Sequence, residues 1–454
     1  MTNKNEQGRF HYAWVILIVA TLVLGVYVPI VNSLSNTWQL AVTSDLGFSR
    51  TKFSFNTTIT QAVGIFLGPV VSYFLTKYDF KRIWRITALI FAGAVFGYSM
   101  AQNEYHFYVL AFFVGFAYIT TAQIPMMMLI NNWFNEKRGL ATSIAVSGIS
   151  AGGAILSPMI SALIKNFGWR SSYRIYSIII LVIAVLAGYF FIYLKPENLG
   201  LKPYGYIPDG INEDNNEDTN EASKDPKEMH ADKANELAAQ AEIKTEVNKE
   251  KMKSLNVGLS ISASLTTVFF ISLLLGSVMN GLANGATLQF PPALQDAAGV
   301  GTAGKVVALY LLLGVFGKLL IGRIADKYGI YIALALSSAA LALSFVCMLF
   351  ADKTWGAWAV AVVFGLGLAI GTVVPPLITS AIFDKDMYGE AYGFVQSSMQ
   401  VGAAFGPLLV SVIYDYSGTY SWAWIINIIF SVLTGILWIL AHKQAKFYAN
   451  KVEK

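Results

Sequence analysis

A single lysine lies deep inside an apolar stretch of the sequence, where a charged side chain is costly. Lys318 is thirteen residues after Lys305 and eight residues before Asp326. On a helix that rises 1.5 Å per residue, thirteen residues place it roughly 20 Å from Lys305, a long reach for a flexible side chain. An ammonium group at such depth can bind an anion. Two other interpretations stay open, because the side chain can also extend to the nearer interface or cap main-chain carbonyl groups.

Two pairs of asparagines are candidates for hydrogen-bonding groups of the same site. Asn32 and Asn36 are one helical turn apart, as are Asn280 and Asn284, so each pair is predicted to share a helix face. Their amides can donate to a ligand oxygen or bond between helices, and the sequence leaves both open. Other polar residues at similar depth have the same ambiguity, and four are retained as candidate binding residues: Tyr118, Gln123, Tyr310 and Gln396.

Other kinds of chemistry find little support in the residues present. The one cysteine, Cys347, allows neither an intrachain disulfide nor a thiolate metal cluster. The four histidines stand in polar segments or near helix ends, so no metal or other cofactor is expected. Neither paired carboxylates nor a Ser–His arrangement occurs at depth, so we predict no catalytic residues and no enzyme.

The composition identifies the elements that must position these residues. Hydrophobic residues make up 55% of the 454 and charged residues 13%, against about 25% charged in a typical soluble protein. Most of the chain runs in apolar blocks of 18 or more residues, and a membrane-spanning helix needs about 20. These numbers exclude a soluble enzyme, a nucleic-acid-binding protein and a secreted disulfide scaffold. They predict an all-α polytopic membrane protein, whose partners include membrane lipid but no nucleic acid.

We count twelve predicted spans, all helical, because lipid cannot satisfy open backbone groups. The first apolar run is too long for a cleaved signal peptide and is interpreted as a retained span. The twelve spans begin near Ala13, Phe53, Trp84, Tyr105, Gly139, Tyr173, Leu259, Ala303, Ile332, Trp355, Ala391 and Trp422.

The distribution of Lys and Arg predicts the orientation. With a cytoplasmic N-terminus, the inner short loops hold nine basic residues and the outer loops seven. Adding the two chain ends makes the ratio fifteen to seven, which favours both termini inside the cytoplasmic (plasma) membrane.

Charge also predicts the domain boundaries. Residues 195–256 are rich in Lys, Glu, Asp and Asn and are too polar to bury a core. We therefore expect a six-helix bundle over residues 1–194, a largely disordered cytoplasmic linker over 195–256, a second bundle over 257–442 and a cytoplasmic tail over 443–454. A regulatory or partner-binding role for the linker is the alternative to a simple tether.

The two halves of the chain repeat each other at one nearly constant offset. Gly115 and Pro125 recur as Gly365 and Pro375, 250 residues later, and three further matches fall at offsets of 248 to 250. The repeat predicts two pseudo-symmetric six-helix bundles, the architecture of secondary transporters that bind substrate near the bilayer midplane.

The loop after the eighth span, Gly322-Arg-Ile-Ala-Asp326-Lys327-Tyr-Gly329, resembles the Gly-x-x-x-Asp-Arg/Lys-x-Gly signature of the major facilitator superfamily. In that interpretation Gly322, Asp326, Lys327 and Gly329 form an inner gate. Asp326 can cap a neighbouring helix N-terminus and pair with a cytoplasmic Arg or Lys, and Lys137 and Arg138 complete the predicted gate. The counterpart in the first half, residues 72–79, lacks both glycines and the aspartate, so a first-half gate of this kind is not predicted.

Residues 133–153, which begin Trp-Phe-Asn-Glu-Lys-Arg-Gly, are similar to a signature of the monocarboxylate-porter family, which includes the oxalate–formate antiporters. The resemblance extends over essentially the whole membrane portion. It implies that Lys318 occupies the position of the substrate-binding cation, usually an Arg. This sequence has Gly314 where the family has an acidic residue and Asn32 where many members have a basic one, and it lacks a second cation in the eleventh span. A monoanion therefore fits better than a dicarboxylate.

These observations predict a carrier of a small organic anion, such as lactate or pyruvate, that works by alternating access as a monomer. Protons or a counter-anion are the possible coupled partners, so symport and antiport both stay open. The alternatives are an exporter of amphipathic compounds and a non-transporting receptor that signals through residues 195–256.

Overall fold

The computed structural model describes residues 11–32, 34, 37–47, 50–206 and 261–452, and most of these residues are helical. The first half contains α1 (Tyr12–Val31), α2 (Gln39–Leu46), α3 (Arg50–Lys77), α4 (Phe80–Tyr98), α5 (Glu104–Thr121), α6 (Gln123–Trp133), α7 (Arg138–Val185), a π-helical turn (Leu186–Phe191) and a 3-10 turn (Pro196–Leu199). The second half contains α9 (Ile261–Ser264), α10 (Val268–Ala286), a 3-10 turn (Thr287–Gln289), α11 (Phe290–Ala298), α12 (Val300–Tyr328), α13 (Ile330–Met348), α14 (Thr354–Gly367), α15 (Val374–Ile382), α16 (Lys385–Ser417) and α17 (Ser421–Val452).

These helices account for the twelve predicted spans. Nine helical segments of the described residues are long and apolar enough to cross a membrane, and one of them, Arg138–Phe191, contains two predicted spans. Gly168, with φ of +79°, breaks the helix between those two spans. The two other spans are α4, whose first turns carry Lys81, Arg82 and Arg85, and the broken pair α14 and α15. The start predicted near Leu259 lies outside the described residues, and α10 begins at Val268.

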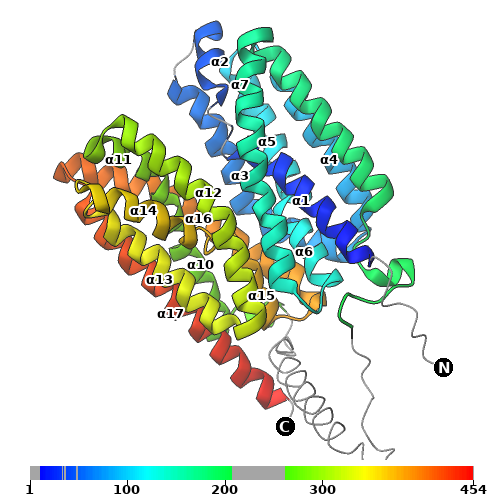
Figure 1. Ribbon diagram of the computed structural model, residues 1–454. Helices are drawn as coiled ribbons and strands as arrows, with labels where there is room; N and C mark the ends of the chain where they lie inside the picture. The colour runs from blue at the N-terminus through cyan, green and yellow to red at the C-terminus, as the bar shows by residue number, and fades with distance from the viewer. Residues whose placement is uncertain (1–10, 33, 35–36, 48–49, 207–260, 453–454) are drawn as a thin grey trace, which may run out of the picture.

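The spans form two bundles, one from α1 to α7 and one from α10 to α17 (Figure 1). The bundles repeat each other in their packing as well as their sequence. Gly115 on α5 lies against Thr60 on α3, and Gly365 on α14 lies against Tyr310 on α12, which is 250 residues after Thr60. In each bundle the fourth span is broken near its middle, between α5 and α6 or between α14 and α15.

The two bundles meet near one end of the molecule, which we call the closed end: the end where α1 begins and α17 ends. There α3 packs on α16, and α7 packs on α12. From the closed end the ribbons of the two bundles diverge toward the end that carries α2 and α11, the far end (Figure 1).

Small residues let the helices touch where the bundles meet. A Cβ on Gly393 of α16 would lie 1.7 Å from the Ser72 hydroxyl on α3. A Cβ on Gly322 of α12 would lie 1.8 Å from the Ser143 hydroxyl on α7. Ser72 and Gly322 are equivalent positions of the repeat, and so are Ser143 and Gly393. Each of the two helix contacts therefore pairs one serine with one glycine, with the roles exchanged between the halves.

The segment after the sixth span is fixed against the first bundle. The main-chain N–H of Tyr204 donates to the Trp133 carbonyl at 2.8 Å, and the N–H of Asn135 donates to the Tyr204 carbonyl at 2.9 Å. The Tyr204 ring packs edge-on against Trp14, with 5.6 Å between ring centroids. The first part of the predicted linker, up to residue 206, is thus ordered, and the rest lies outside the described residues. At the other end of the chain, α17 continues through most of the predicted tail, to Val452.

The closest helix approach within a bundle yields a test of this packing. A Cβ on Gly152 of α7 would lie 1.8 Å from the Gly25 carbonyl oxygen on α1, whereas a Cβ on Gly93 of α4 would meet nothing within 4 Å. We expect Gly152→Ala to lower the free energy of unfolding by about 1–3 kcal/mol, because the two backbones must separate. Gly93→Ala is the control and should leave it unchanged or raise it by up to about 1 kcal/mol. Thermal unfolding of the detergent-solubilised protein measures both, and equal midpoints would contradict the close approach.

Candidate functional site

Lys318 lies between the two bundles, on the face of α12 that packs against α7. Its side chain is only 4% exposed, and its ammonium donates to the Ser150 hydroxyl at 2.8 Å. In the part of the chain that the structure describes, no carboxylate lies within ion-pair distance of it. An ammonium has three donors, and the one hydrogen bond found here uses a neutral side chain from the opposite bundle rather than a main-chain carbonyl. Lys318 is therefore a buried cation without a counter-charge.

The face of α7 opposite Lys318 is lined with serines. Ser143, Ser147 and Ser150 follow one another at helical spacing and so share that face. Ser143 donates to the Gly139 carbonyl, and Ser150 accepts from Lys318. The Ser147 hydroxyl is buried and has no hydrogen-bond partner. One helical turn from Ser150, the structure thus holds a polar group with unused hydrogen-bonding capacity.

Asn32 lies at the end of α1. The helix ends at Val31 with Asn32 as its C-cap, and the predicted face shared with Asn36 is not tested. Asn36 itself lies outside the described residues. The Asn32 side chain accepts from Gln61 of α3 at 3.3 Å, and it also contacts the Tyr118 hydroxyl of α5. Asn32 therefore gathers three spans of the first bundle at one point.

Asn280 and Asn284 do share one face of α10, as predicted. The Asn284 amide donates to the Asn280 side-chain oxygen at 2.7 Å, and the Asn280 amide donates to the Ile370 carbonyl at 3.4 Å. Ile370 belongs to the break between α14 and α15, and Gly371 lies directly against Asn284. Asn280 is fully buried. This pair therefore stabilises the broken span, and only the partly exposed Asn284 can face a ligand.

The remaining candidates separate into two groups. Gln123 begins α6 and lies beside the Tyr392 hydroxyl of α16. This contact joins the two bundles, although the Tyr392 hydroxyl makes no hydrogen bond of standard geometry. One turn further along α16, the Gln396 carbonyl oxygen is buried without a partner. Tyr310 instead packs its ring against Phe364 inside the second bundle, with 5.0 Å between centroids. The structure thus brings Gln123 and Gln396 toward the contact between bundles and gives Tyr310 a packing role.

Asp326 caps the helix of the opposite bundle, as predicted. Its two carboxylate oxygens accept from the N–H groups of Gly139 at 2.6 Å and Leu140 at 2.8 Å, in the first turn of α7. Gly322 is required by contact, because its Cβ would lie 2.3 Å from the Gly139 carbonyl oxygen. Gly329 ends α12 with φ of +87°, a conformation that favours glycine.

The predicted ion pair between Asp326 and a basic residue is wrong. No cation lies within ion-pair distance of Asp326 among the described side chains. Arg138 donates to the carbonyls of Phe134, at 3.1 Å, and of Ser380, at 3.5 Å. Lys137 bonds the Tyr204 hydroxyl at 3.4 Å, and this contact raises the pKa of the Lys137 ammonium. Lys327 lies over the Tyr328 ring, 5.0 Å from its centroid.

The first half has a matching contact in which the donor and acceptor are exchanged between the two helices. Thr76 of α3 is the equivalent of Asp326, and its hydroxyl donates at 3.4 Å to the carboxylate of Glu390, in the second turn of α16. The loss of the signature from this half removed the charged cap but left a polar contact between α3 and α16.

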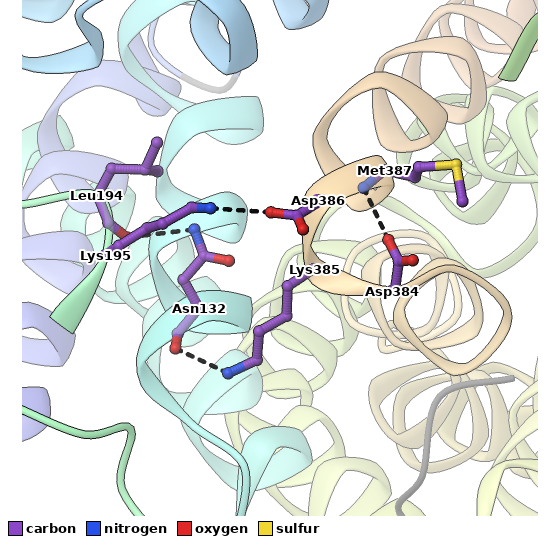
Figure 2. Close-up of polar contacts among 7 residues, drawn as sticks. All are labelled: Asn132, Leu194, Lys195, Asp384, Lys385, Asp386 and Met387. Carbon is purple, nitrogen blue, oxygen red and sulfur yellow. Dashed lines mark hydrogen bonds and ion pairs between the residues drawn. The ribbon is translucent and has the colours of Figure 1, made fainter. Parts of the chain in front are cut away.

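Figure 2 shows polar contacts at the closed end that sequence reasoning missed. The Lys385 ammonium donates to the Asn132 carbonyl at 3.0 Å, across the boundary between bundles. Lys195 pairs with Asp386 at 2.8 Å, also across that boundary. Asp384 caps α16 by accepting from the Met387 N–H at 2.9 Å. The sequence signal was slight: an Asp followed by a helix predicts the cap, but nothing local predicts the partners of Lys195 and Lys385.

Within the described part of the chain, no group of three or more His, Cys, Asp or Glu side chains could hold a metal ion. The chemistry that the arrangement offers is hydrogen bonding and charge. Lys318 supplies the charge, and amide and hydroxyl groups from both bundles supply donors and acceptors.

Comparisons with known proteins agree with this geometry. Residues 13–381 and 273–453 match the Major Facilitator Superfamily. The MFS transporter asaE of Aspergillus flavus is 31% identical over 145 residues, 31% of each chain. Monocarboxylate transporter 3 of Gallus gallus is 22% identical over 166 residues, 36% of this chain and 30% of that protein. An MFS-type transporter of Gibberella moniliformis is 22% identical over 394 residues, 82% of this chain and 78% of that protein.

Two solved structures share the fold at 14% sequence identity. The transporter FucP in its outward conformation has a TM-score of 0.65 and matches 95% of this chain and 99% of its own. The proton:xylose symporter XylE has a TM-score of 0.63 and matches 94% of both chains. These likenesses confirm the predicted twelve-helix architecture.

The Asp326 cap allows a direct test of the closed end. Removing the carboxylate by Asp326→Ala leaves two N–H groups of α7 without acceptors, at a cost of about 1–3 kcal/mol. We expect the closed end to open more often, so that a cysteine placed at the buried Ser380, in a Cys347→Ser background, reacts about tenfold faster with a small thiol reagent.

Thr76→Ala is the matched control for this test. It removes the equivalent contact of the first half, which is longer and has an uncharged donor, so the labelling rate should rise less than about threefold. Equal labelling rates in the two variants would show that the Asp326 cap does not hold the bundles together.

Proposed function

The chain belongs to the Major Facilitator Superfamily, and on that premise we propose that it transports a small organic anion of the monocarboxylate class, such as lactate or pyruvate, by alternating access. The observation that carries this proposal is the burial of Lys318 without a carboxylate partner. A buried charge is costly unless it is paired, and a substrate carboxylate supplies the missing partner.

The position of Lys318 supports a site that both bundles share. The lysine belongs to the second bundle, and Ser150, which accepts a hydrogen bond from it, belongs to the first. A relative movement of the bundles changes the surroundings of the ammonium directly. One cation balances one negative charge, which favours a monoanion over a dicarboxylate. A lysine is also a point charge, so it selects less strictly than the planar fork of an arginine.

Polar groups from both bundles can bind the remaining oxygens of such an anion. Asn32, Tyr118 and Gln123 come from the first bundle, and Asn284 and Gln396 from the second. Of these, Asn32 is exposed and Asn284 and Gln396 are partly exposed. A hydroxy or keto group next to the carboxylate gives these side chains a hydrogen-bonding partner, which a simple fatty acid lacks.

The proposal also assigns an orientation. The closed end carries a concentration of basic residues, namely Lys77, Lys81, Arg82, Lys137 and Lys195. Basic residues favour the cytoplasmic side of a membrane, so the closed end faces the cytoplasm and the anion enters from the far end. The protein acts in the cytoplasmic membrane as a single chain, with protons or a counter-anion as the coupled species, and carries out no chemical conversion.

Uptake of radiolabelled monocarboxylates into proteoliposomes tests the proposal. We expect saturable uptake by the wild type and a loss of at least about tenfold in Lys318→Ala, which removes the buried charge proposed to bind substrate between the bundles. Lys318→Arg keeps the charge and should retain part of the uptake. Lys305→Ala is the control, because Lys305 is exposed on the same helix.

The remaining outcomes distinguish the alternatives. Wild-type uptake that survives Lys318→Ala would move the binding site elsewhere. If none of the acids is taken up, the anion proposal fails, and export of amphipathic compounds becomes the function to test. With uptake established, stimulation by an imposed pH gradient indicates proton coupling, whereas stimulation by preloaded anion indicates exchange.

A further inference from the structure

We propose that Arg138 and Lys385 form a second anion-binding station at the closed end, which receives the substrate from Lys318 when the bundles separate there. This inference rests on the function proposed above. Asp326 caps the helix that begins with Arg138, and Lys318 precedes Asp326 by eight residues on α12. At 1.5 Å per residue, Asp326 lies about 12 Å from Lys318 along α12. The second station, which begins at Arg138 beside Asp326, therefore lies about 12 Å from the first, toward the closed end.

The two cations come from different bundles, and each donates a hydrogen bond to a carbonyl of the opposite bundle. Arg138 begins α7 and donates to the Ser380 carbonyl of the second bundle. Lys385 begins α16 and donates to the Asn132 carbonyl of the first bundle (Figure 2). Both side chains are partly buried, and no carboxylate lies within ion-pair distance of either one among the described residues. The hydrogen bonds that these two cations make across the boundary are thus cation-to-carbonyl bonds.

Lys195 provides a contrast on the same surface. Unlike Arg138 and Lys385, it has a carboxylate partner within ion-pair distance, Asp386 at 2.8 Å (Figure 2). Its ammonium therefore forms an ion pair. Arg138 and Lys385 instead donate their hydrogen bonds to neutral carbonyls, although Asp326 lies near Arg138 and Asp386 and Glu197 lie near Lys385. Lys195 thus serves as a control for two cations that have no direct carboxylate partner in the described part of the chain.

A row of polar side chains runs along α16 from the second station. Lys385, Tyr388, Tyr392 and Gln396 follow at three- or four-residue intervals and lie on one face of α16. The rings of Tyr388 and Tyr392 stack with 5.6 Å between centroids, and Tyr388 lies near Arg138. At the other end of the row, the Gln396 carbonyl oxygen is buried without a partner.

Two further buried polar side chains, on α6 and α7, lack hydrogen-bond partners among the described residues, which is unusual for a purely structural contact. Both side-chain polar atoms of Asn131, which is 2% exposed on α6, lack a hydrogen-bond partner, as does the buried Ser147 hydroxyl. Buried polar groups in folded proteins are nearly always paired. Here they lie on helices that meet at the boundary between bundles, where opening would expose them to a polar substrate.

The chemistry of the contacts explains how an anion would open this end. A carboxylate meets a cation with a full negative charge, whereas a main-chain carbonyl offers only a dipole. A substrate carboxylate therefore competes well with the carbonyls of Ser380 and Asn132 for the two cations. Binding of the anion at the second station replaces bonds that join the bundles by bonds to the substrate, which favours the open state.

Transport kinetics measured separately from each face tests the second station. The protein is reconstituted in one orientation, and the KM for a transported monocarboxylate is measured from the closed-end side and from the far side. We expect Arg138→Gln and Lys385→Gln each to raise the closed-side KM about tenfold and to leave the far-side KM within twofold. Glutamine keeps a donor for the carbonyl but removes the charge.

Three variants make the result specific. Lys195→Gln should change neither KM by more than twofold, because that lysine is already paired. Lys385→Arg and Arg138→Lys keep the charge and should hold the closed-side KM within about threefold, which separates loss of charge from loss of folding.

The outcomes separate a failure of the second station from a failure of the proposed transport function on which it rests. If the wild type transports the acid and Lys318→Ala abolishes transport, but the two glutamine variants leave the closed-side KM unchanged, the second station is wrong and the carrier proposal stands. An equal rise of KM on both faces also overturns the station. If the wild type takes up none of the acids, the carrier proposal falls and the station falls with it.

Discussion

The structure depends on helices that approach until their backbones touch. In lipid, packing between helices gains little from the hydrophobic effect and relies on close contact of small residues. Within the bundles, Gly25 lies against Gly152, and Gly281 lies against Gly402. Between the bundles, Gly322 and Gly393 lie against serines. Glycine within a bundle fixes the frame, whereas glycine paired with serine between bundles produces a contact that is close but not bonded, and such a contact can separate.

That constraint explains where the candidate site lies. The contacts between α7 and α12 bring Ser150 within hydrogen-bonding distance of Lys318, and they do so only because Gly139, Ser143 and Gly322 occupy little space. A larger residue at any of these positions would hold the two helices apart and leave the ammonium without its acceptor. Burial of the charge is therefore a result of backbone packing several residues away.

Much of this architecture can be predicted from the sequence, and the features that could not be predicted share identifiable physical reasons. The depth of Lys318, the shared face of Asn280 and Asn284 and the cap by Asp326 all depend on helical periodicity or a local motif, which one sequence contains. The end of α1 at Val31 depends on three-dimensional packing, and periodicity alone extends the helix too far. The bond from Lys385 to the Asn132 carbonyl joins residues 253 positions apart through a main-chain atom, which residue types cannot indicate. Arg138 likewise prefers carbonyls to the nearby Asp326, whose oxygens the N–H groups of α7 already occupy.

The stretch from Arg138 to Lys195 has a mechanical consequence. It starts next to Gly139 and Leu140, which bind Asp326, and it finishes at Lys195, which binds Asp386. Between these points it crosses the molecule and returns, turning at Gly168. These two contacts with carboxylates of the second bundle thus lie at one end of a single helical hairpin. A rotation of the hairpin about its turn would strain them together, so their release should be cooperative, with few molecules half-latched.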